Sequence, residues 1–333
     1  MTIPLSILDL APIQPGQTAR ESFAASVALA QAAEKHGYTR VWYAEHHNMP
    51  TIASSATSIL VGHVAAQTST IRLGAGGVML PNHSPLTIAE QYGTLAELYP
   101  GRIDLGLGRA PGSDQNTARA MRRDPRASDQ FPQDVLELQA YLRGESIIPG
   151  VQAVPGAGTD VPLYILGSSL FGARLAAALG LPYAFASHFA PDALHEAVAT
   201  YRRDFTPSQQ LAEPHVIVGV NVIAAEDAAD AALQFETTRR ARVRGMIARG
   251  PAAPDYTDEQ IDAFLTTTQG IQIATMMRYS AVGTPSEVRA FLEDFAASAQ
   301  ADELIIAHQS RDIAARLRSV ELTAEAMTGV MRG

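Results

Sequence analysis

Two adjacent histidines, His46 and His47, end an apolar run that starts at Val41. The unperturbed pKa of an imidazole is about 6.5, which suits proton transfer near neutral pH. Because neighbouring residues of a strand point to opposite faces, one ring can face a ligand while the other packs behind it. The alternative is a pair of structural, hydrogen-bonded histidines. Their position at the end of a predicted strand favours a functional role.

A cluster of glycines interrupts the next apolar run, in the sequence Gly74-Ala75-Gly76-Gly77. Glycine weakens a strand interior and often permits another group to approach closely. The cluster indicates either a flat ligand lying against the backbone or a backbone geometry that other residues cannot adopt. A β-bulge or a bend in a barrel strand is the alternative.

An arginine and a glycine–serine turn could bind a phosphate group. Arg109 follows a third apolar run, and a guanidinium there can hold a phosphate through two hydrogen bonds. Gly167, Ser168 and Ser169 precede a predicted helix, whose free N–H groups attract an anion. A surface arginine and ordinary N-capping serines are the alternatives. The glycines before Arg109 match the dinucleotide fingerprint poorly, because a long polar loop follows them.

The sequence carries no HExxH, GxSxG, P-loop or EF-hand motif. Asp9, His188 and His308 lie at or near the predicted ends of other strands, where together they could ligate a metal. The first strand has no HxH pair, however, and the carboxylates and histidines are otherwise scattered. We therefore predict no metal site and expect each of these histidines to be a hydrogen-bonded wall residue.

Strand-like runs alternate with helical patterns along almost the whole chain. Thr18 and Glu21 form a capping-box signature, and Ser84 with Pro85 marks another helix start. The predicted strands are 5–10, 40–45, 71–80, 102–107, 163–166, 183–186, 216–223 and 303–307. The predicted helices are 18–36, 57–67, 85–98, 132–143, 170–179, 192–205, 227–249, 286–297 and 313–327.

Eight strands, each followed by a helix, predict an α/β fold, namely a (β/α)8 TIM barrel with insertion segments. A doubly wound sheet is the alternative, but it would rarely use eight strands without a second composition zone. We expect a single domain over 1–333, with an irregular insertion at 110–129 and a lid at 250–284. In such a barrel the candidate residues lie at the carboxyl ends of neighbouring strands, where barrel enzymes place their sites.

The composition excludes several classes of protein. The chain has 333 residues, 47% of them hydrophobic, and a formal net charge of −9. This charge argues against nucleic acid or an anionic membrane as the main partner. The chain has no cysteine, which excludes disulfides and thiolate nucleophiles. The apolar runs are too short to span a bilayer, and no signal peptide is evident, so we expect a cytoplasmic protein.

Two segments closely resemble the bacterial luciferase-like flavin-dependent monooxygenases: AEHHN and LGAGGVMLPNHSPLTIAEQYGTLAELYPGRIDLGLGRAPG. The strongest resemblance covers roughly residues 5–112, and a weaker one continues through LYILGSS and VGTPSEVRAFLEDFAASAQADELIIAH. It implies a (β/α)8 barrel that binds reduced FMN at its carboxyl face. It also implies that the flavin reacts with dioxygen at C4a and that the peroxyflavin oxidises a small organic substrate.

The resemblance assigns roles to the candidate residues. It implies that His46 is the catalytic acid or base near the flavin. It implies that a non-proline cis peptide joins Gly76 and Gly77 beneath the isoalloxazine ring. Arg109 matches the phosphate-binding arginine, and the phosphate loop contains three more residues, Gly167, Ser168 and Ser169. The chain departs from luciferase at Gly108, which replaces a reactive cysteine, so we do not expect thiol-dependent behaviour. The segment after the seventh predicted strand is only loosely similar to the mobile loop of luciferase, so the resemblance predicts neither aldehyde specificity nor light emission.

Partners and alternatives follow from the same comparison. No NAD(P)H fingerprint is evident, so we expect a separate NAD(P)H-dependent flavin reductase. The resemblance suggests a homodimer, packed through the alanine-rich helices 57–67 and 85–98. The alternatives are a deazaflavin-dependent hydride-transfer enzyme, a non-catalytic flavin-binding protein and a metal-dependent barrel hydrolase. Met276, Met277 and Tyr279 could give the lid an apolar face, or they could simply pack helices.

Overall fold

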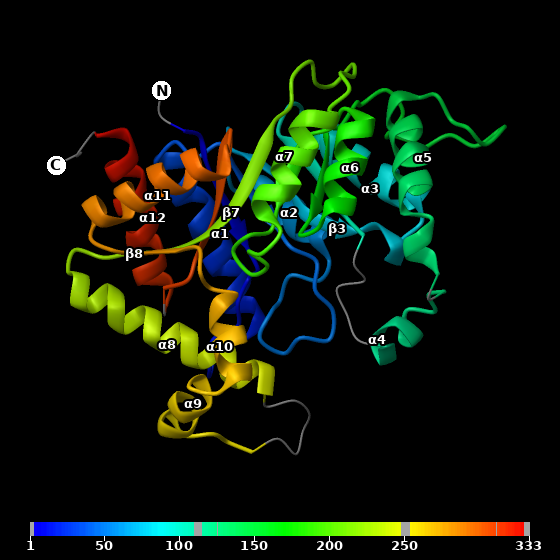
Figure 1. The fold of residues 1–333 in the computed structure, drawn as a ribbon. Helices are drawn as coiled ribbons and strands as arrows, with labels where there is room; N and C mark the ends of the chain where they lie inside the picture. Colours follow the sequence, from blue (N-terminus) through cyan, green and yellow to red (C-terminus); the bar gives the residue numbers. More distant parts are fainter. Residues whose placement is uncertain (1–2, 110–114, 125, 248–253, 311, 330–333) are drawn as a thin grey trace.

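The structure is a computed structural model that describes residues 3–109, 115–124, 126–247, 254–310 and 312–329 (Figure 1). Its strands are β1 (Leu5–Asp9), β2 (Arg40–Tyr43), β3 (Arg72–Met79), β4 (Ile103–Gly108), β5 (Leu163–Gly167), β6 (Tyr183–Phe185), β7 (Val216–Ala224), β8 (Ser280–Gly283) and β9 (Glu303–His308). Its α-helices are α1 (Ala19–Lys35), α2 (Thr57–Ala65), α3 (Pro85–Leu98), α4 (Gln115–Ala120), α5 (Phe131–Arg143), α6 (Leu170–Leu179), α7 (Leu194–Asp204), α8 (Ala228–Ile247), α9 (Asp258–Leu265), α10 (Thr268–Thr275), α11 (Pro285–Ala299) and α12 (Ile313–Thr328). Two short 3-10 helices are η1 (Leu80–Asn82) and η2 (Ala127–Asp129).

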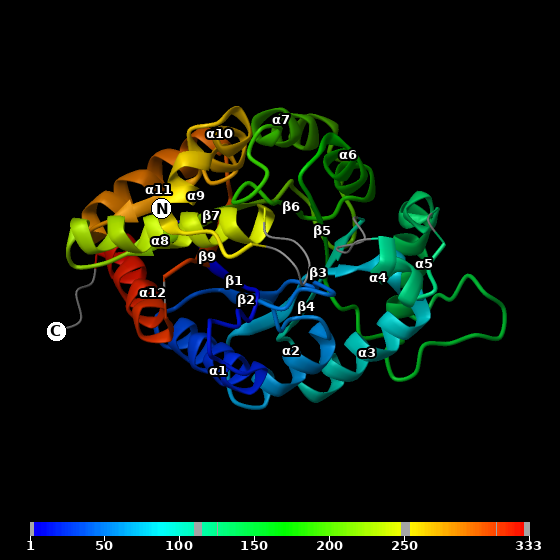
Figure 2. The same ribbon diagram turned by 90° about the horizontal axis from the view of Figure 1, so that it is seen from below.

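Eight of these strands form a closed parallel barrel. Their order is β1-β2-β3-β4-β5-β6-β7-β9, and pairing of β9 with β1 closes the ring. Helices surround the strands, with α1, α2 and α3 along one side, α6, α7 and α11 along the other, and α12 beside α1 (Figure 2). The predicted (β/α)8 barrel is therefore confirmed. Outside the ring of strands, α8, α9 and α10 lie together at one end of the barrel (Figure 1).

One strand, β8, falls inside the segment that we expected to be an irregular lid. It pairs in parallel with Asn221–Ala224 of β7, beyond the residues of β7 that pair with β6. Its four residues are too few to show a strand period, so the sequence pattern misses it. The helices α9 and α10 occupy much of the same segment, of which residues 250–253 lie outside the described part. The role of this segment as a lid stays a prediction.

The other expected insertion contains only short helical pieces. Between β4 and α5 the described residues form α4, of six residues, and η2, of three. Residues 110–114 and 125 of this insertion are not among those described. The insertion follows the strand that ends beside Arg109, so it leaves the barrel at the same end as the candidate site.

The predicted helix starts show the expected hydrogen bonds. The Thr18 hydroxyl accepts from the backbone N–H of Glu21 at 3.3 Å, and the Glu21 carboxylate accepts from the backbone N–H of Thr18 at 2.7 Å. At α3, the Ser84 hydroxyl accepts from the backbone N–H of Thr87 at 3.3 Å. These caps satisfy backbone donors that would otherwise lack partners. Local sequence therefore determines where both helices begin.

An ion network fills the barrel interior at the amino ends of the strands. Buried Arg40 donates to Glu303 at 2.9 Å and, from Nη1, to Asp104 at 2.8 Å and to the Tyr164 hydroxyl at 2.7 Å. The indole N–H of Trp42 donates to Asp104 at 3.1 Å. Burial opposes the charge of Arg40, but Asp104 and Glu303 hold its pKa above the ordinary value. This end of the barrel therefore contributes to stability. The candidate functional residues lie at the opposite end, after the carboxyl ends of the strands.

Among the described helices, none has both the length and the apolar character that a bilayer crossing requires. The cytoplasmic location stays a prediction.

Candidate active site

The candidate residues lie at the carboxyl ends of four consecutive barrel strands. His46 follows β2, Gly76 and Gly77 belong to β3, and Arg109 follows β4. Gly167 ends β5, and Ser168 and Ser169 link it to α6. The fold thus brings to one rim residues that are more than 100 positions apart in the sequence. It does not by itself assign their roles.

The glycine cluster contains an unusual backbone. The peptide bond between Gly76 and Gly77 is cis, as the resemblance implies. The pairing of β3 with β4 also shifts register between Ala75 and Val78, so the β-bulge that we considered as an alternative is present as well.

Close packing explains why side chains are absent from this part of β3. A Cβ on Gly76 would lie 2.8 Å from the Cβ of Trp42, and one on Gly77 would lie 2.7 Å from the carbonyl oxygen of Gly106. Contacts this short with backbone or a buried indole require the surroundings to shift. The glycines are therefore required by the barrel itself, and their contact with a flavin stays a prediction.

Buried Glu45 organises the loops after β2 and β3. Its carboxylate is hydrogen-bonded to His47 at 2.8 Å and to His83 at 2.9 and 3.0 Å. It also accepts from the backbone N–H of Met79 at 3.0 Å. Burial raises the pKa of Glu45, but the hydrogen bonds and charge of His83, with His47 and Met79, outweigh this and lower it overall. Glu45 is thus held as a carboxylate that ties the two loops together.

The sequence pattern did not single out Glu45 or His83 as a pair. His83 lies 38 positions after Glu45, and only the adjacency of β2 and β3 brings the two together. Both residues fall within the two segments that carry the family resemblance, which is the one signal that could have pointed to them.

His46 and His47 lie in the loop that follows β2, and they differ in their contacts. His47 faces Glu45, whereas the Nδ1 of His46 is buried and has no hydrogen-bond partner among the described residues. The backbone N–H of His46 donates to the carbonyl of Ser54 at 2.9 Å, which fixes its position. Burial lowers the pKa of His46, although the Ala44 backbone and Glu45 oppose the shift. The lowered pKa favours the neutral form of the ring near pH 7.

Arg109 lies over the aromatic ring of a residue in the first turn of α6. Its guanidinium carbon lies 4.1 Å from the centroid of the Phe171 ring. Ser169 is the N-cap residue of α6, but its side chain makes no capping hydrogen bond. Its carbonyl accepts from the hydroxyl of Tyr183 at 3.0 Å, which anchors the turn. A cation and the free N–H groups of a helix start therefore lie side by side, an arrangement that suits an anion.

Two of the residues that we weighed as metal ligands have protein partners. The Nδ1 of His308 is hydrogen-bonded to the Ser319 hydroxyl at 2.9 Å, and its Nε2 lies 3.4 Å from the Tyr38 hydroxyl. Asp9 accepts from Arg316 at 2.9 Å. Within the described part of the chain, no group of three or more histidines and carboxylates is arranged to hold a metal ion. His308 is thus a hydrogen-bonded wall residue, as expected.

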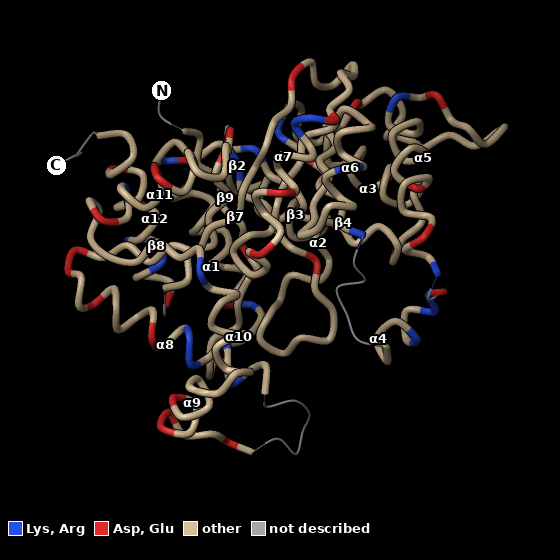
Figure 3. The backbone as a smooth tube through the Cα atoms, in the orientation of Figure 1, with Lys and Arg blue, Asp and Glu red and all other residues tan. Residues whose placement is uncertain are grey.

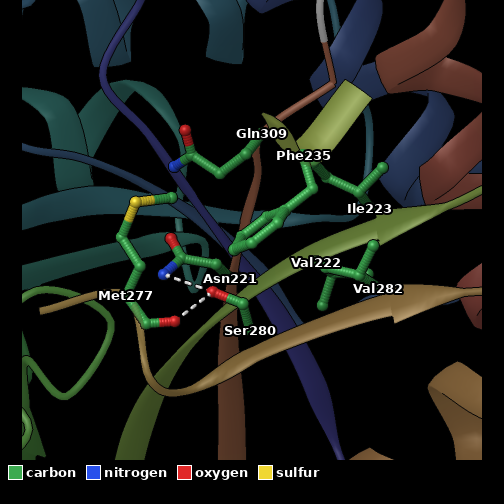
Figure 4. Close-up of a pocket in the computed structure, with 8 residues that line it drawn as sticks. All are labelled: Asn221, Val222, Ile223, Phe235, Met277, Ser280, Val282 and Gln309. Carbon is green, nitrogen blue, oxygen red and sulfur yellow. Dashed lines mark hydrogen bonds between the residues drawn. The ribbon is translucent and has the colours of Figure 1, made fainter. Parts of the chain in front are cut away.

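A narrow pocket lies between β7, β8 and α8, beside the barrel mouth. It is lined by Asn221, Val222, Ile223, Phe235, Met277, Ser280, Val282 and Gln309 (Figure 4). Met277 is buried in this pocket, so it packs against the protein, and Tyr279 packs against Phe295 with ring centroids 4.6 Å apart. These contacts support the packing alternative for both residues.

Comparison with known proteins decides the family. Residues 3–303 match the family described as luciferase-like monooxygenase. The chain belongs to the luciferase-like monooxygenase family. This confirms the resemblance seen in the sequence and the class of enzyme expected from it.

Two bacterial proteins are similar to this chain over nearly their whole length. An Escherichia coli K12 protein named luciferase-like monooxygenase is 49% identical, over 97% of each chain. The uncharacterized protein YvbT of Bacillus subtilis is 47% identical, over 96% of each chain. Among solved structures, apo-MsnO8 has a TM-score of 0.88 and 36% identity, covering 99% of this chain and 100% of its own.

More distant structures share the fold of the luciferase-like monooxygenase family. One is the oxygenating constituent of a 3,6-diketocamphane monooxygenase from Pseudomonas putida in complex with FMN, with a TM-score of 0.74, 16% identity and 99% of each chain covered. Another is an F420-dependent secondary alcohol dehydrogenase, with a TM-score of 0.71, 16% identity and 98% of this chain covered. Flavin and deazaflavin cofactors both occur within this fold.

Proposed function

We propose that the protein is an FMN-dependent monooxygenase that uses reduced FMN and dioxygen to oxidise a small organic substrate. The observation that carries the proposal is the match of almost the whole barrel to the luciferase-like monooxygenase family. In the overall reaction one oxygen atom enters the substrate, the other leaves as water, and reduced FMN becomes FMN.

The residues of the rim fit the phosphate end of FMN. The guanidinium of Arg109 rests on Phe171 beside the first turn of α6, where the Ser169 side chain leaves the N–H groups uncapped. Charge-assisted hydrogen bonds from a guanidinium and from helix N–H groups suit a phosphate. In our proposal Arg109, Gly167, Ser168 and Ser169 hold the phosphate, and Gly76 and Gly77 lie beneath the flavin ring.

The protein contributes position and proton control. Reduced FMN, when bound, supplies the two electrons that activate dioxygen. His46 offers a buried Nδ1 that has no hydrogen-bond partner among the described residues and is in its neutral form near pH 7. Such a nitrogen can accept a proton from a reacting group or return one to it. Exclusion of water by the segment around α9 and α10 is part of the same proposal.

Rapid mixing tests the proposal. The protein with photoreduced FMN is mixed with oxygenated buffer, and flavin absorbance is followed in wild type, His46→Gln and His63→Gln. We expect the wild type to slow reoxidation relative to free flavin. His46→Gln should change that rate at least about tenfold. His63→Gln replaces an exposed histidine of α2 and should match the wild type. Reoxidation at the rate of free flavin would contradict the proposal.

A second candidate is a deazaflavin-dependent hydride-transfer enzyme, which the F420-dependent structure with the same fold supports. Fluorescence titration of the protein with FMN and with F420 separates the two, because each proposal expects a clear preference for its own cofactor. A non-catalytic flavin-binding protein would instead bind FMN tightly, with no effect of His46→Gln on reoxidation.

We also propose two protein partners. A separate NAD(P)H-dependent flavin reductase would supply reduced FMN, and a second copy of the chain would pack against α2 and α3. An exposed isoleucine of α2, Ile59, supports the second proposal, since 73% of its surface is accessible.

A further inference from the structure

The insertion that follows β4 is basic, although the protein as a whole is acidic. Residues 109–130 contain five arginines and three aspartates, which give this segment a formal charge of +2. Because the whole chain carries −9, the remaining residues carry −11. Figure 3 shows blue positions grouped around α4. Besides Arg109, the arginines of the segment are Arg119, Arg122, Arg123 and Arg126, which we call the arginine cluster.

Hydrogen bonds hold this insertion against the rim of the barrel. The hydroxyl of Ser128 in η2 donates to the carbonyl of Arg109 at 3.3 Å, so the insertion returns to the residue where it starts. The guanidinium of Arg123 donates to the carbonyl of Asn82 in η1, the turn after β3. The two short helices η1 and η2 are also in contact. The arginine cluster is therefore attached to the ends of β3 and β4, the strands of the glycine pair and of Arg109.

Two members of the cluster carry charges that no carboxylate neutralises. Arg123 is half-buried and holds η1, and Arg126 pairs with Asp124 at 3.4 Å. Arg119 and Arg122 are exposed, and neither forms an ion pair with a residue that the structure describes. Exposed charges of this kind contribute little to stability, but their field extends into the solvent. The structure therefore gives Arg119 and Arg122 no role in packing.

The ligand that we expect at this rim is an anion. A phosphate monoester such as that of FMN carries a charge of about −1.5 to −2 near pH 7. The overall charge of the protein repels such a ligand, whereas the arginine cluster attracts it. The field of an exposed charge extends about 10 Å at 0.1 M ionic strength and about 30 Å at 0.01 M. The cluster can therefore act on an approaching phosphate without touching it.

We propose that the arginine cluster, through Arg119 and Arg122, attracts the anionic flavin to the phosphate site at Arg109 and so speeds its capture. This inference rests on the proposed function and concerns how the cofactor reaches its site. A rim of charge opposite to that of the ligand raises association rates by about 10- to 1000-fold. Free reduced FMN is oxidised by dioxygen in solution. An enzyme that receives reduced FMN by diffusion from a reductase therefore benefits from rapid capture.

Stopped-flow binding of FMN tests the inference. Quenching of flavin fluorescence on mixing with the full-length protein gives the association and dissociation rate constants. At about 0.01 M ionic strength, Arg119→Gln/Arg122→Gln should bind FMN about three- to tenfold more slowly than wild type, with an unchanged dissociation rate. At about 0.5 M the difference should disappear, because salt screens exposed charges. Riboflavin, which lacks the phosphate, should bind both proteins at the same rate.

A second double variant controls for the net charge. Lys35→Gln/Arg203→Gln also removes two positive charges, but from the last turns of α1 and α7. In a barrel of this kind the helices run back from the carboxyl ends of the strands, so these two residues lie away from the mouth. The control variant should bind FMN at the rate of wild type.

Each outcome decides the question. The inference is wrong if Arg119→Gln/Arg122→Gln captures FMN as fast as wild type at low ionic strength, or if the control variant is slowed equally. It is also wrong if the loss is the same with riboflavin or appears only in the dissociation rate, since the arginines would then not act through charge at a distance. Failure of wild type to bind FMN would contradict the proposed function as well, whereas the other outcomes leave it standing.

Discussion

The central carbon of the Arg109 guanidinium lies 4.1 Å from the centroid of the Phe171 ring. The two residues are 62 positions apart, one after β4 and the other in the first turn of α6. The aromatic ring thus holds the cation beside the helix start where we place the flavin phosphate.

The first prediction concerns this pair. Phe171→Leu should weaken FMN binding by about two- to fivefold, because an exposed cation–π contact contributes about 0.5–1 kcal/mol. Arg109→Gln should weaken it about ten- to 100-fold, since it removes charge-assisted hydrogen bonds. Quenching of flavin fluorescence measures both constants. Equal effects of the two substitutions would mean that Phe171 contacts the flavin directly.

The second prediction concerns Glu45. In Glu45→Gln the amide keeps one acceptor oxygen for four donating residues, so the free energy of unfolding should fall by about 1–3 kcal/mol. Urea unfolding measures the change. Glu97→Gln alters an exposed glutamate of α3 and should unfold as wild type does. Unchanged stability of Glu45→Gln would show that the histidine pairs do not hold the two loops.

The third prediction concerns the ion network at the amino end of the barrel. Arg40→Met removes a buried cation that pairs with both Asp104 and Glu303, which should lower the free energy of unfolding by about 3–5 kcal/mol. Arg203→Met breaks an exposed pair with Asp204 and should have little effect. Chemical unfolding of both variants provides the comparison. Similar behaviour of the two would argue that the network adds nothing to stability.

The fourth prediction concerns pH. Burial, and then the charge of Arg316, lowers the pKa of His308 to about 3, whereas the unfolded side chain titrates near 6.5. Between these two pKa values the unfolded state binds more protons than the folded state. The contribution of His308 to the free energy of unfolding is therefore fully present above pH 6.5 and is lost as the pH falls below it. One such histidine contributes about 1.4 kcal/mol per pH unit. Between pH 6 and 5 the free energy of unfolding of His308→Gln should change with pH less steeply than that of wild type, by this amount. An identical slope would place His308 outside the buried core.

The fifth prediction concerns the homodimer. Ile59→Glu places a charge at an exposed apolar position of α2 and should convert a dimer to a monomer in sedimentation velocity experiments. Ile147→Glu changes another exposed isoleucine, far from α2 in the sequence, and should leave the dimer intact. A monomeric wild type at micromolar concentration would contradict the proposed dimer.

Much of the fold follows from local patterns. Apolar runs with their turn residues predict all eight barrel strands, and the caps at Thr18 and Ser84 locate two helix starts, because these signals depend on neighbours within four residues. Two continuous segments of the sequence carry the family resemblance, and they contain His46, the glycine pair and Arg109. The sequence by itself therefore determined the barrel, the family and the candidate rim.

The tertiary structure decided the contacts between distant segments. β8 exists because β7 extends beyond its pairing with β6 and offers a free edge to a run too short to be recognised. Glu45 meets His83 and Arg109 meets Phe171 because the closed barrel brings separate strand ends to one rim. A pattern in the sequence reports the neighbours along the chain, whereas each of these pairs depends on neighbours across the fold.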